Sequence, residues 1–128
     1  MNKNYAELQE IMNYGNATNE YHRLTMVRNF LVTDGVKLFA EAASAYWLSD
    51  VVMSYLPKIA KINDYFFVVI MKVSNDNKGT FRIYHEINGK KKTTVRQKIP
   101  FTNLPTGEYK FFLFKRDGVF LMMFPKEY

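Results

Sequence analysis

The stretch TDGVK at residues 33–37, with AYWLSD shortly after it at residues 45–50, decides the fold of this chain. The side-chain oxygens of Thr33 and Asp34 can accept hydrogen bonds from the free amide groups of a first helical turn, so a helix is predicted to begin here. A break near Ser44 separates this helix from a second one. We expect Pro57 to end or kink the second helix, because proline lacks an amide donor.

A short helix and a strand are expected before this block. Residues 4–14 place apolar side chains at three- and four-residue steps on one face of a helix, and Gly15 is a typical stop signal. Residues 21–27 alternate loosely and are rich in β-forming residues, which predicts a strand.

From residue 65 onward the pattern is that of strands. Residues 65–73 form a long apolar run, residues 80–87 and 92–99 alternate on either side of Asn88-Gly89, and two further strands flank Asp117-Gly118. The sequence therefore predicts a four- or five-stranded antiparallel meander packed on the helices. Residues 1–128 are interpreted as a single α+β domain.

Composition excludes several classes of protein. The chain has no cysteine, so disulfides, cysteine nucleophiles and thiolate metal sites are ruled out. Its longest apolar run, residues 65–71, is too short to span a bilayer, and the first residues lack the features of a signal peptide. We therefore expect a cytoplasmic protein with no membrane contact.

The charge is unevenly distributed. Residues 1–64 carry a net charge of −1 and residues 65–128 carry +7. A basic second half favours an acidic or nucleic-acid partner. The alternative is a solvated surface whose lysines and arginines serve only solubility, and the sequence supports it equally well.

No residue pattern predicts catalysis or a bound metal. His22 and His85 are far apart and lack the carboxylate spacing of a metal site, so no cofactor is expected. Asp34 is explained by helix capping and Glu41 by a solvent-facing helix position. Asp50 follows Trp47 by one helical turn and is expected to accept a hydrogen bond from the indole or from a neighbouring amide.

Basic residues around the Asn88-Gly89 hairpin are the one candidate binding surface. Arg82, Arg96 and Lys98 share strand parity and are predicted to point the same way. Basic side chains beside an aromatic ring suit nucleic acid, through counterion release and base stacking. The predicted binding residues are Arg82, Tyr84, Lys90, Lys91, Lys92, Arg96, Lys98 and Lys110.

The helical block also resembles a family of unknown function found in small proteins of phages and mobile elements. The residues that match its signature are Thr33, Asp34, Gly35, Val36, Lys37, Ala45, Tyr46, Trp47, Leu48 and Asp50. The resemblance implies a helical unit followed by an antiparallel sheet, and a signature that is mainly structural.

This resemblance implies binding rather than catalysis. The leading hypothesis is a non-enzymatic inhibitor of an RNA-guided bacterial defence nuclease, an anti-CRISPR protein that engages a CRISPR effector or its guide-RNA channel through the basic sheet. The alternative is a stand-alone accessory protein that binds RNA or single-stranded DNA. A third hypothesis is a small enzyme that uses Asp34, Glu41, Asp50 and a histidine.

Overall fold

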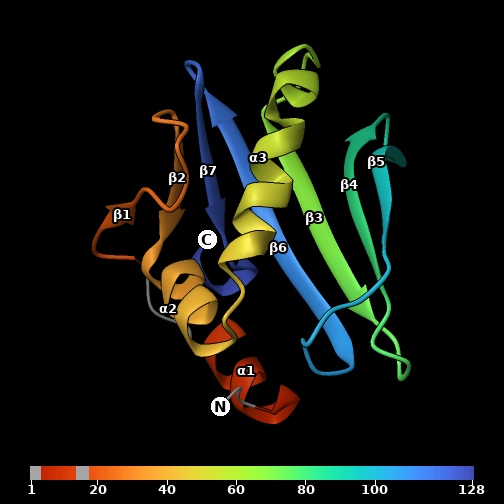
Figure 1. The fold of residues 1–128 in the computed structure, drawn as a ribbon. Helices are drawn as coiled ribbons and strands as arrows, with labels where there is room; N and C mark the ends of the chain where they lie inside the picture. The colour runs from red at the N-terminus through yellow and green to blue at the C-terminus, as the bar shows by residue number, and fades with distance from the viewer. Residues whose placement is uncertain (1–3, 14–17) are drawn as a thin grey trace.

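The computed structural model describes residues 4–13 and 18–128, which form a seven-stranded sheet with helices packed on one side of it (Figure 1). This is the α+β class that the sequence predicts. In chain order the elements are α1 (Tyr5–Met12), β1 (Tyr21–His22), β2 (Phe30–Thr33), α2 (Asp34–Ala42), α3 (Tyr46–Ala60), β3 (Phe66–Val73), β4 (Gly79–Ile87), β5 (Lys90–Ile99), β6 (Gly107–Arg116), β7 (Val119–Met123) and the 3-10 helix η1 (Pro125–Glu127).

The strands do not lie side by side in chain order. The sheet order is β1-β2-β7-β6-β3-β4-β5, and every neighbouring pair is antiparallel except β2 and β7, which run parallel. Helices followed by antiparallel strands agree with the prediction, but the chain returns from β5 at the edge and places β6 beside β3 instead of beside β5. Strand β3 is buried on both faces, as Phe67 and Val68 show, so it takes a central position with a neighbour on each side.

Two N-terminal strands extend the sheet beyond the four or five strands predicted. The strand expected over residues 21–27 is limited to β1, and β2 forms from residues that the sequence presents only as the approach to the helical block. Strand β2 pairs in parallel with β7, with Phe30 opposite Phe120 and Val32 opposite Met122. Local periodicity does not reveal this pairing, because parallel partners are distant in sequence.

The helical block begins and breaks where the sequence predicts. Thr33 caps α2 by accepting a hydrogen bond from the amide of Val36, and Ser44 adopts a φ of 51° between α2 and α3. Helix α3 continues through Pro57 to Ala60, so of the two effects expected of Pro57 an end of the helix is wrong and a kink stays a prediction. Buried Leu56 and Ile59 hold the last turn against the core. The predicted stop at Gly15 lies outside the described residues.

The helices and one face of the sheet share a continuous core. The ring of Phe39 in α2 lies 5.6–5.7 Å from the rings of Tyr109, Phe111 and Phe124. Trp47 is partly buried and packs against this core from α3. The helices therefore cover the sheet face that carries Phe67 and Phe111, and the opposite face, called the open face below, has separate packing.

Candidate functional site

Most of the predicted basic residues, but not all, lie on the open face. Arg82 and Arg96 lie directly opposite each other on β4 and β5, and Lys98 lies opposite Thr80 two positions further along. Because cross-strand partners share a face and alternate residues return to it, the three side chains point the same way, as predicted. Lys110 on β6 lies opposite Ile70 and so joins them on this face.

A β-bulge divides the three lysines at the hairpin. Ile83 pairs with Val95 but Tyr84 pairs with Thr93, so Thr94 is left without a partner in the ladder. The bulge inverts the alternation beyond it. Lys91 therefore faces the open side, whereas Lys90 and Lys92 face the side of the helices. Simple parity would have placed Lys92 with Arg96, and sequence reasoning missed the bulge.

Tyr84 does not offer the exposed ring predicted for it. The side chain is only 5% exposed and belongs to a small cluster with Val68 and Ile70. The guanidinium of Arg82 and the ammonium of Lys91 lie 6.0 Å and 5.0 Å from its ring centre. Tyr84 thus supports the basic residues and cannot serve as a stacking platform for a base.

Other aromatic side chains of the open face form a cluster beside the basic residues. This aromatic cluster consists of Phe66, Phe112, Phe114 and Tyr128. Tyr128 is 84% exposed and stacks on Phe114 with ring centres 5.5 Å apart and planes within 7°. The ammonium of Lys110 lies 5.9 Å from the centre of the Phe112 ring. The alternation along β6 predicts that Phe112 and Phe114 share a face of the sheet. Nothing in the sequence predicts that Tyr128 packs against them.

An apolar groove of about 800 Å³ adjoins the aromatic cluster. Leu31, Leu121 and Met123 line it, and they share the open face because the neighbouring Phe30, Phe120 and Met122 are core residues. Tyr128 also borders the groove, so basic residues, aromatic cluster and groove form one continuous surface on the open face.

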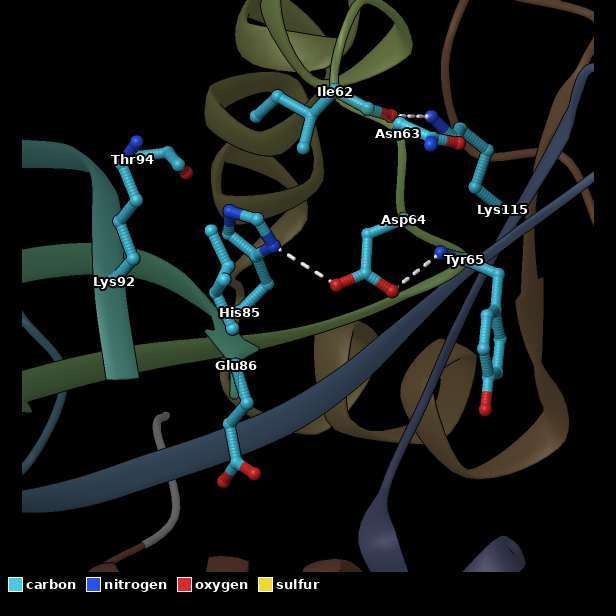
Figure 2. Close-up of a pocket in the computed structure, with 10 residues that line it drawn as sticks. Ile62, Asn63, Asp64, Tyr65, His85, Glu86, Lys92, Thr94 and Lys115 are labelled. Atoms are coloured by element: carbon cyan, nitrogen blue, oxygen red, sulfur yellow. Dashed lines mark hydrogen bonds and ion pairs between the residues drawn. The ribbon is translucent and has the colours of Figure 1, made fainter. Parts of the chain in front are cut away.

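A second hollow, of about 710 Å³, lies at the side of the sheet that the helices cover (Figure 2). In it, His85 Nδ1 lies 2.9 Å from Oδ2 of Asp64. Burial acts to raise the pKa of Asp64, but the hydrogen bonds from His85 and from the amides of Tyr65 and Phe66 outweigh it, and the pKa is lowered. Asp64 is therefore a carboxylate at neutral pH and holds the imidazole in place.

Lys115 also borders this hollow, but its ammonium is engaged elsewhere. Its Nζ donates to the carbonyl oxygens of Ile59, Ala60 and Ile62, which lie at the end of α3 and just after it. A cation at a helix C-terminus satisfies the last carbonyls and complements the helix dipole. The role of Lys115 is thus structural, and its hydrogen bonds help to explain how α3 extends to Ala60, three residues beyond Pro57.

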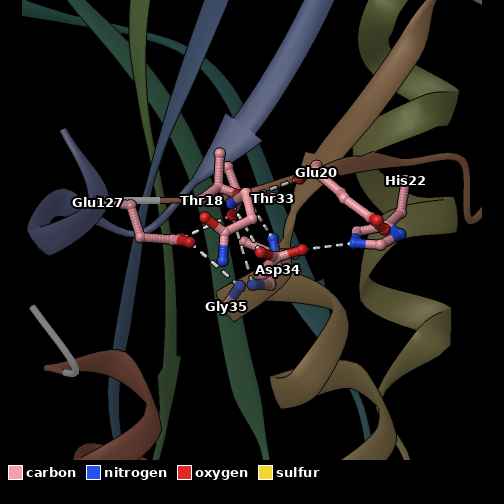
Figure 3. Close-up of polar contacts among 9 residues, drawn as sticks. Thr18, Glu20, His22, Thr33, Asp34, Gly35 and Glu127 are labelled. Carbon is pink, nitrogen blue, oxygen red and sulfur yellow. Dashed lines mark hydrogen bonds and ion pairs between the residues drawn. The ribbon is translucent and has the colours of Figure 1, made fainter. Parts of the chain in front are cut away.

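The signature residues meet the C-terminal η1 helix (Figure 3). The Glu127 carboxylate accepts hydrogen bonds from the buried hydroxyl of Thr33 at 2.6 Å, from the amide of Gly35 at 3.1 Å and from the amide of Phe124 at 2.9 Å. A Cβ at residue 35 would lie 2.8 Å from the Glu127 carboxyl carbon, so a side chain there would displace this carboxylate from its present position. This cluster accounts for Thr33 and Gly35 structurally.

Asp34 makes contacts on the other side of the same helix start (Figure 3). Its carboxylate lies 2.7 Å from Nε2 of His22 and accepts from the amide of Asn19 at 2.8 Å, while its own amide donates to Thr18. The His22 hydrogen bond, followed by that of Asn19, lowers the pKa of Asp34 against the opposing effect of burial. Asp34 ties the preceding loop to α2, and the N-cap itself is Thr33.

Glu20, His22 and Asp34 present ligand atoms within 4.8 Å of one another, the one such group among the described residues. The sequence did not suggest it. Donors around a tetrahedral zinc ion at about 2.0 Å stand ~3.3 Å apart. The 2.7 Å separation of His22 and Asp34 is that of a hydrogen bond instead, which explains the arrangement without an ion.

The remaining signature residues lie apart from both hollows. Tyr46 and Asp50 are exposed on α3, and Glu41 is exposed on α2, as its helix position predicts. Among the described residues no hydrogen bond joins Asp50 to Trp47, so the expected contact with the indole is wrong. Asp34 and Glu41 lie on α2 and Asp50 lies on α3, and the hypothesis of an enzyme that combines them stays a prediction.

Residues 6–128 match the model of a family described as "Family of unknown function (DUF6876)". The chain belongs to this family. A crystal structure described as a protein of unknown function from Enterococcus faecalis has a similar fold, with a TM-score of 0.54 and 15% identity over 85% of this chain and 98% of that one. This likeness concerns the fold alone. No curated protein matches the sequence.

The family assignment leaves the origin of the protein untested. The resemblance to phage and mobile-element proteins stays a prediction, as does the bacterial cytoplasm as its location. No helix of the described residues is long and apolar enough to cross a membrane.

Replacement of Glu127 by alanine should lower the free energy of unfolding by about 2–3 kcal/mol, because three donors lose a charged acceptor at the start of α2. Urea unfolding followed by circular dichroism measures this. The matched control is Lys126→Ala, an exposed neighbour whose loss should change stability by less than about 0.5 kcal/mol. Equal stability of the two variants would contradict a stabilising role for Glu127.

Stability should depend on the ionisation of Asp34. Because its pKa is lowered in the folded protein, its stabilising effect is complete above the unfolded value of about 3.9 and is lost as the pH falls through the folded value. The urea midpoints of wild type and Asp34→Asn should differ at pH 7 and converge below about pH 4. Asp50→Asn, which removes a carboxylate without a hydrogen-bond partner in the described chain, should leave the midpoint unchanged. A constant gap between wild type and Asp34→Asn down to pH 3 would refute the assignment.

Proposed function

We propose that this DUF6876 protein is a non-enzymatic binding protein that takes single-stranded nucleic acid on the open face of its sheet. The supporting observation is that basic and aromatic residues lie side by side there. The basic residues include Lys72, Arg82, Lys91, Arg96, Lys98 and Lys110. Two acidic residues, Glu86 and Glu108, share the face, so positive charge predominates.

Each part of the surface has a distinct role in this proposal. The arginines and lysines of β4, β5 and β6 neutralise phosphates, and the release of counterions drives association. The exposed ring of Tyr128, held on Phe114, stacks against a base. A duplex cannot offer its base faces to such a ring, so the surface favours an unpaired strand.

The apolar groove supplies further contact for bases or sugars that leave the aromatic cluster. Its floor of Leu31, Leu121 and Met123 is continuous with Tyr128, so one strand can contact both regions. Contacts of this kind are sequence-tolerant, because every base has an apolar face. We therefore expect modest preferences among sequences and a strong preference for single strands.

The anti-CRISPR hypothesis stays a prediction. No residue of the open face distinguishes a free strand from a guide RNA held in a nuclease, or from an acidic protein surface. Affinity measurements distinguish an inhibitor from a stand-alone nucleic-acid-binding protein, because an inhibitor would bind the assembled effector far more tightly than it binds RNA alone.

Reversal of three charges on the open face should abolish binding. The variant Arg82→Glu/Arg96→Glu/Lys98→Glu should lose at least 100-fold in affinity for a fluorescently labelled single-stranded RNA, measured by anisotropy at low salt. In wild type, log K should fall linearly with log salt concentration, at about 0.7 per phosphate contacted. Removal of three contacts should make that slope shallower by about 2.

The matched control reverses three charges on the helical side, Lys37→Glu/Lys58→Glu/Lys61→Glu, and should keep most of the wild-type affinity. Both variants are first compared by thermal unfolding, since surface changes of this kind are expected to leave the fold intact. Unchanged affinity in the folded open-face variant would refute the proposal. So would a wild-type protein that binds no single-stranded RNA or DNA at low salt.

Replacement of Tyr128 by alanine tests stacking separately from charge. Loss of one stacked base should weaken single-strand binding about fivefold or more and leave the salt slope unchanged. Tyr46→Ala, which removes another exposed ring on α3, is the control and should have no effect. If Tyr128→Ala binds like wild type, the aromatic cluster does not contact bases.

A further inference from the structure

His85 presents one ring nitrogen to the hollow beside α3 (Figure 2). The residue is only 5% exposed, and its Nδ1 is bonded to Asp64. No hydrogen bond engages Nε2 within the described part of the chain, and none of the described side-chain nitrogens or oxygens is both sealed from solvent and unpartnered. Nε2 therefore opens into the hollow, although the rest of the ring is buried.

Lys92 borders the same hollow from the neighbouring strand. It lies directly opposite His85 on β5. Side chains at such cross-strand positions start about 5 Å apart, so the ammonium and the imidazole can reach one ligand. This juxtaposition depends on the bulge at Thr94, without which Lys92 would face the open side.

The carboxylates near the hollow leave these two groups available. Asp64 is engaged by His85 and by two backbone amides. Figure 2 shows the Glu86 side chain directed away from the imidazole and Asp64. The Lys115 ammonium is directed at the end of α3. An incoming anion would therefore meet Lys92 and Nε2 of His85 first.

We propose that this hollow binds a phosphomonoester of nucleotide size, with the phosphate between Lys92 and His85. In the complex the imidazole carries a proton on both nitrogens: Nδ1–H donates to Asp64, and Nε2–H donates to a phosphate oxygen. Hydrogen bonds between charged partners are the stronger ones. The volume of about 710 Å³ exceeds what a phosphate needs and lies in the range of small-molecule sites.

This site is independent of the proposed binding of single strands, because its residues face the other side of the sheet. The chain has two histidines, each paired with an aspartate, so His22 serves as an internal reference. Inorganic phosphate and a nucleoside monophosphate are titrated at constant pH and ionic strength, and the imidazole signals are followed by NMR. The His85 signals should shift and saturate, and those of His22 should not.

The nucleoside monophosphate should bind more tightly than inorganic phosphate, because the remaining space accommodates its sugar and base. Equal affinities would overturn the nucleotide part of the proposal. Parallel shifts of both histidines, or no saturable shift, would overturn the site itself.

Two pairs of variants localise the contact. Lys92→Gln should weaken phosphate binding about tenfold or more, as expected for loss of a charged hydrogen-bond donor, whereas Lys90→Gln, the same change two residues away on the same face, should not. His85→Gln should weaken phosphate binding similarly, and His22→Gln should leave it unchanged. Binding to these two variants is measured by calorimetry, because each variant lacks one of the two imidazole NMR signals. All variants are compared in thermal stability.

The open-face charge reversal separates the two proposals. It should abolish binding of single strands and leave phosphate binding in the hollow intact. If Lys92→Gln, folded as wild type, binds the nucleoside monophosphate with undiminished affinity, the proposed site is wrong.

Discussion

The architecture depends on the placement of one carboxylate, that of Glu127, at the start of α2. Thr33, Gly35 and Phe124 all donate hydrogen bonds to it. Thr33 and Gly35 lie more than ninety positions before Glu127 in the sequence, whereas Phe124 lies in the same turn as Glu127. A negative charge at a helix N-terminus complements the free amides and the helix dipole. Because β2 runs parallel to β7, both strands end at the same side of the sheet, and the chain that follows β7 reaches the helix that follows β2.

This closure explains why the helical block and the sheet behave as one unit. The glycine at residue 35 permits the close approach, and Thr33 serves both as the helix cap and as a donor to Glu127. Asp34 uses the opposite side of the same turn to fix the preceding loop through Asn19 and His22. The polar groups of residues 33–35 are thus engaged in hydrogen bonds that stabilise the fold.

The sheet separates two kinds of surface. Its helical side buries the core, and its open side carries basic side chains beside a smaller cluster of Val68, Ile70 and Tyr84, against which Phe66 and Phe112 pack. Segregation of this sort concentrates positive charge on the open face, which suits an extended polyanion. The bulge at Thr94 changes both sides at once, since it turns Lys91 toward the open face and Lys92 toward the hollow beside His85.

The two aspartate–histidine pairs show how environment decides what a pair can do. In the first pair, Asp34 bonds Nε2 of His22 and also an amide at a helix start, so its function is to hold a loop. In the second, Asp64 bonds Nδ1 of His85, and the other ring nitrogen remains open to a hollow. The alternation along residues 80–87 predicts that His85 faces inward, but the sequence does not show which aspartate each histidine meets.

The sequence by itself determined the local elements: the helix start at Thr33, the break at Ser44, the two hairpins at Asn88-Gly89 and Asp117-Gly118, and the shared face of Arg82, Arg96 and Lys98. Helix capping, turns with positive φ and the alternation of side chains along a strand each depend on a few neighbouring residues, so they can be predicted from the sequence. Only the tertiary structure decided the strand order, the parallel pairing of β2 with β7, the bulge at Thr94 and the return of Tyr128 and Glu127. These depend on contacts between residues far apart in sequence, whose burial and hydrogen bonding become favourable only when the whole sheet is assembled.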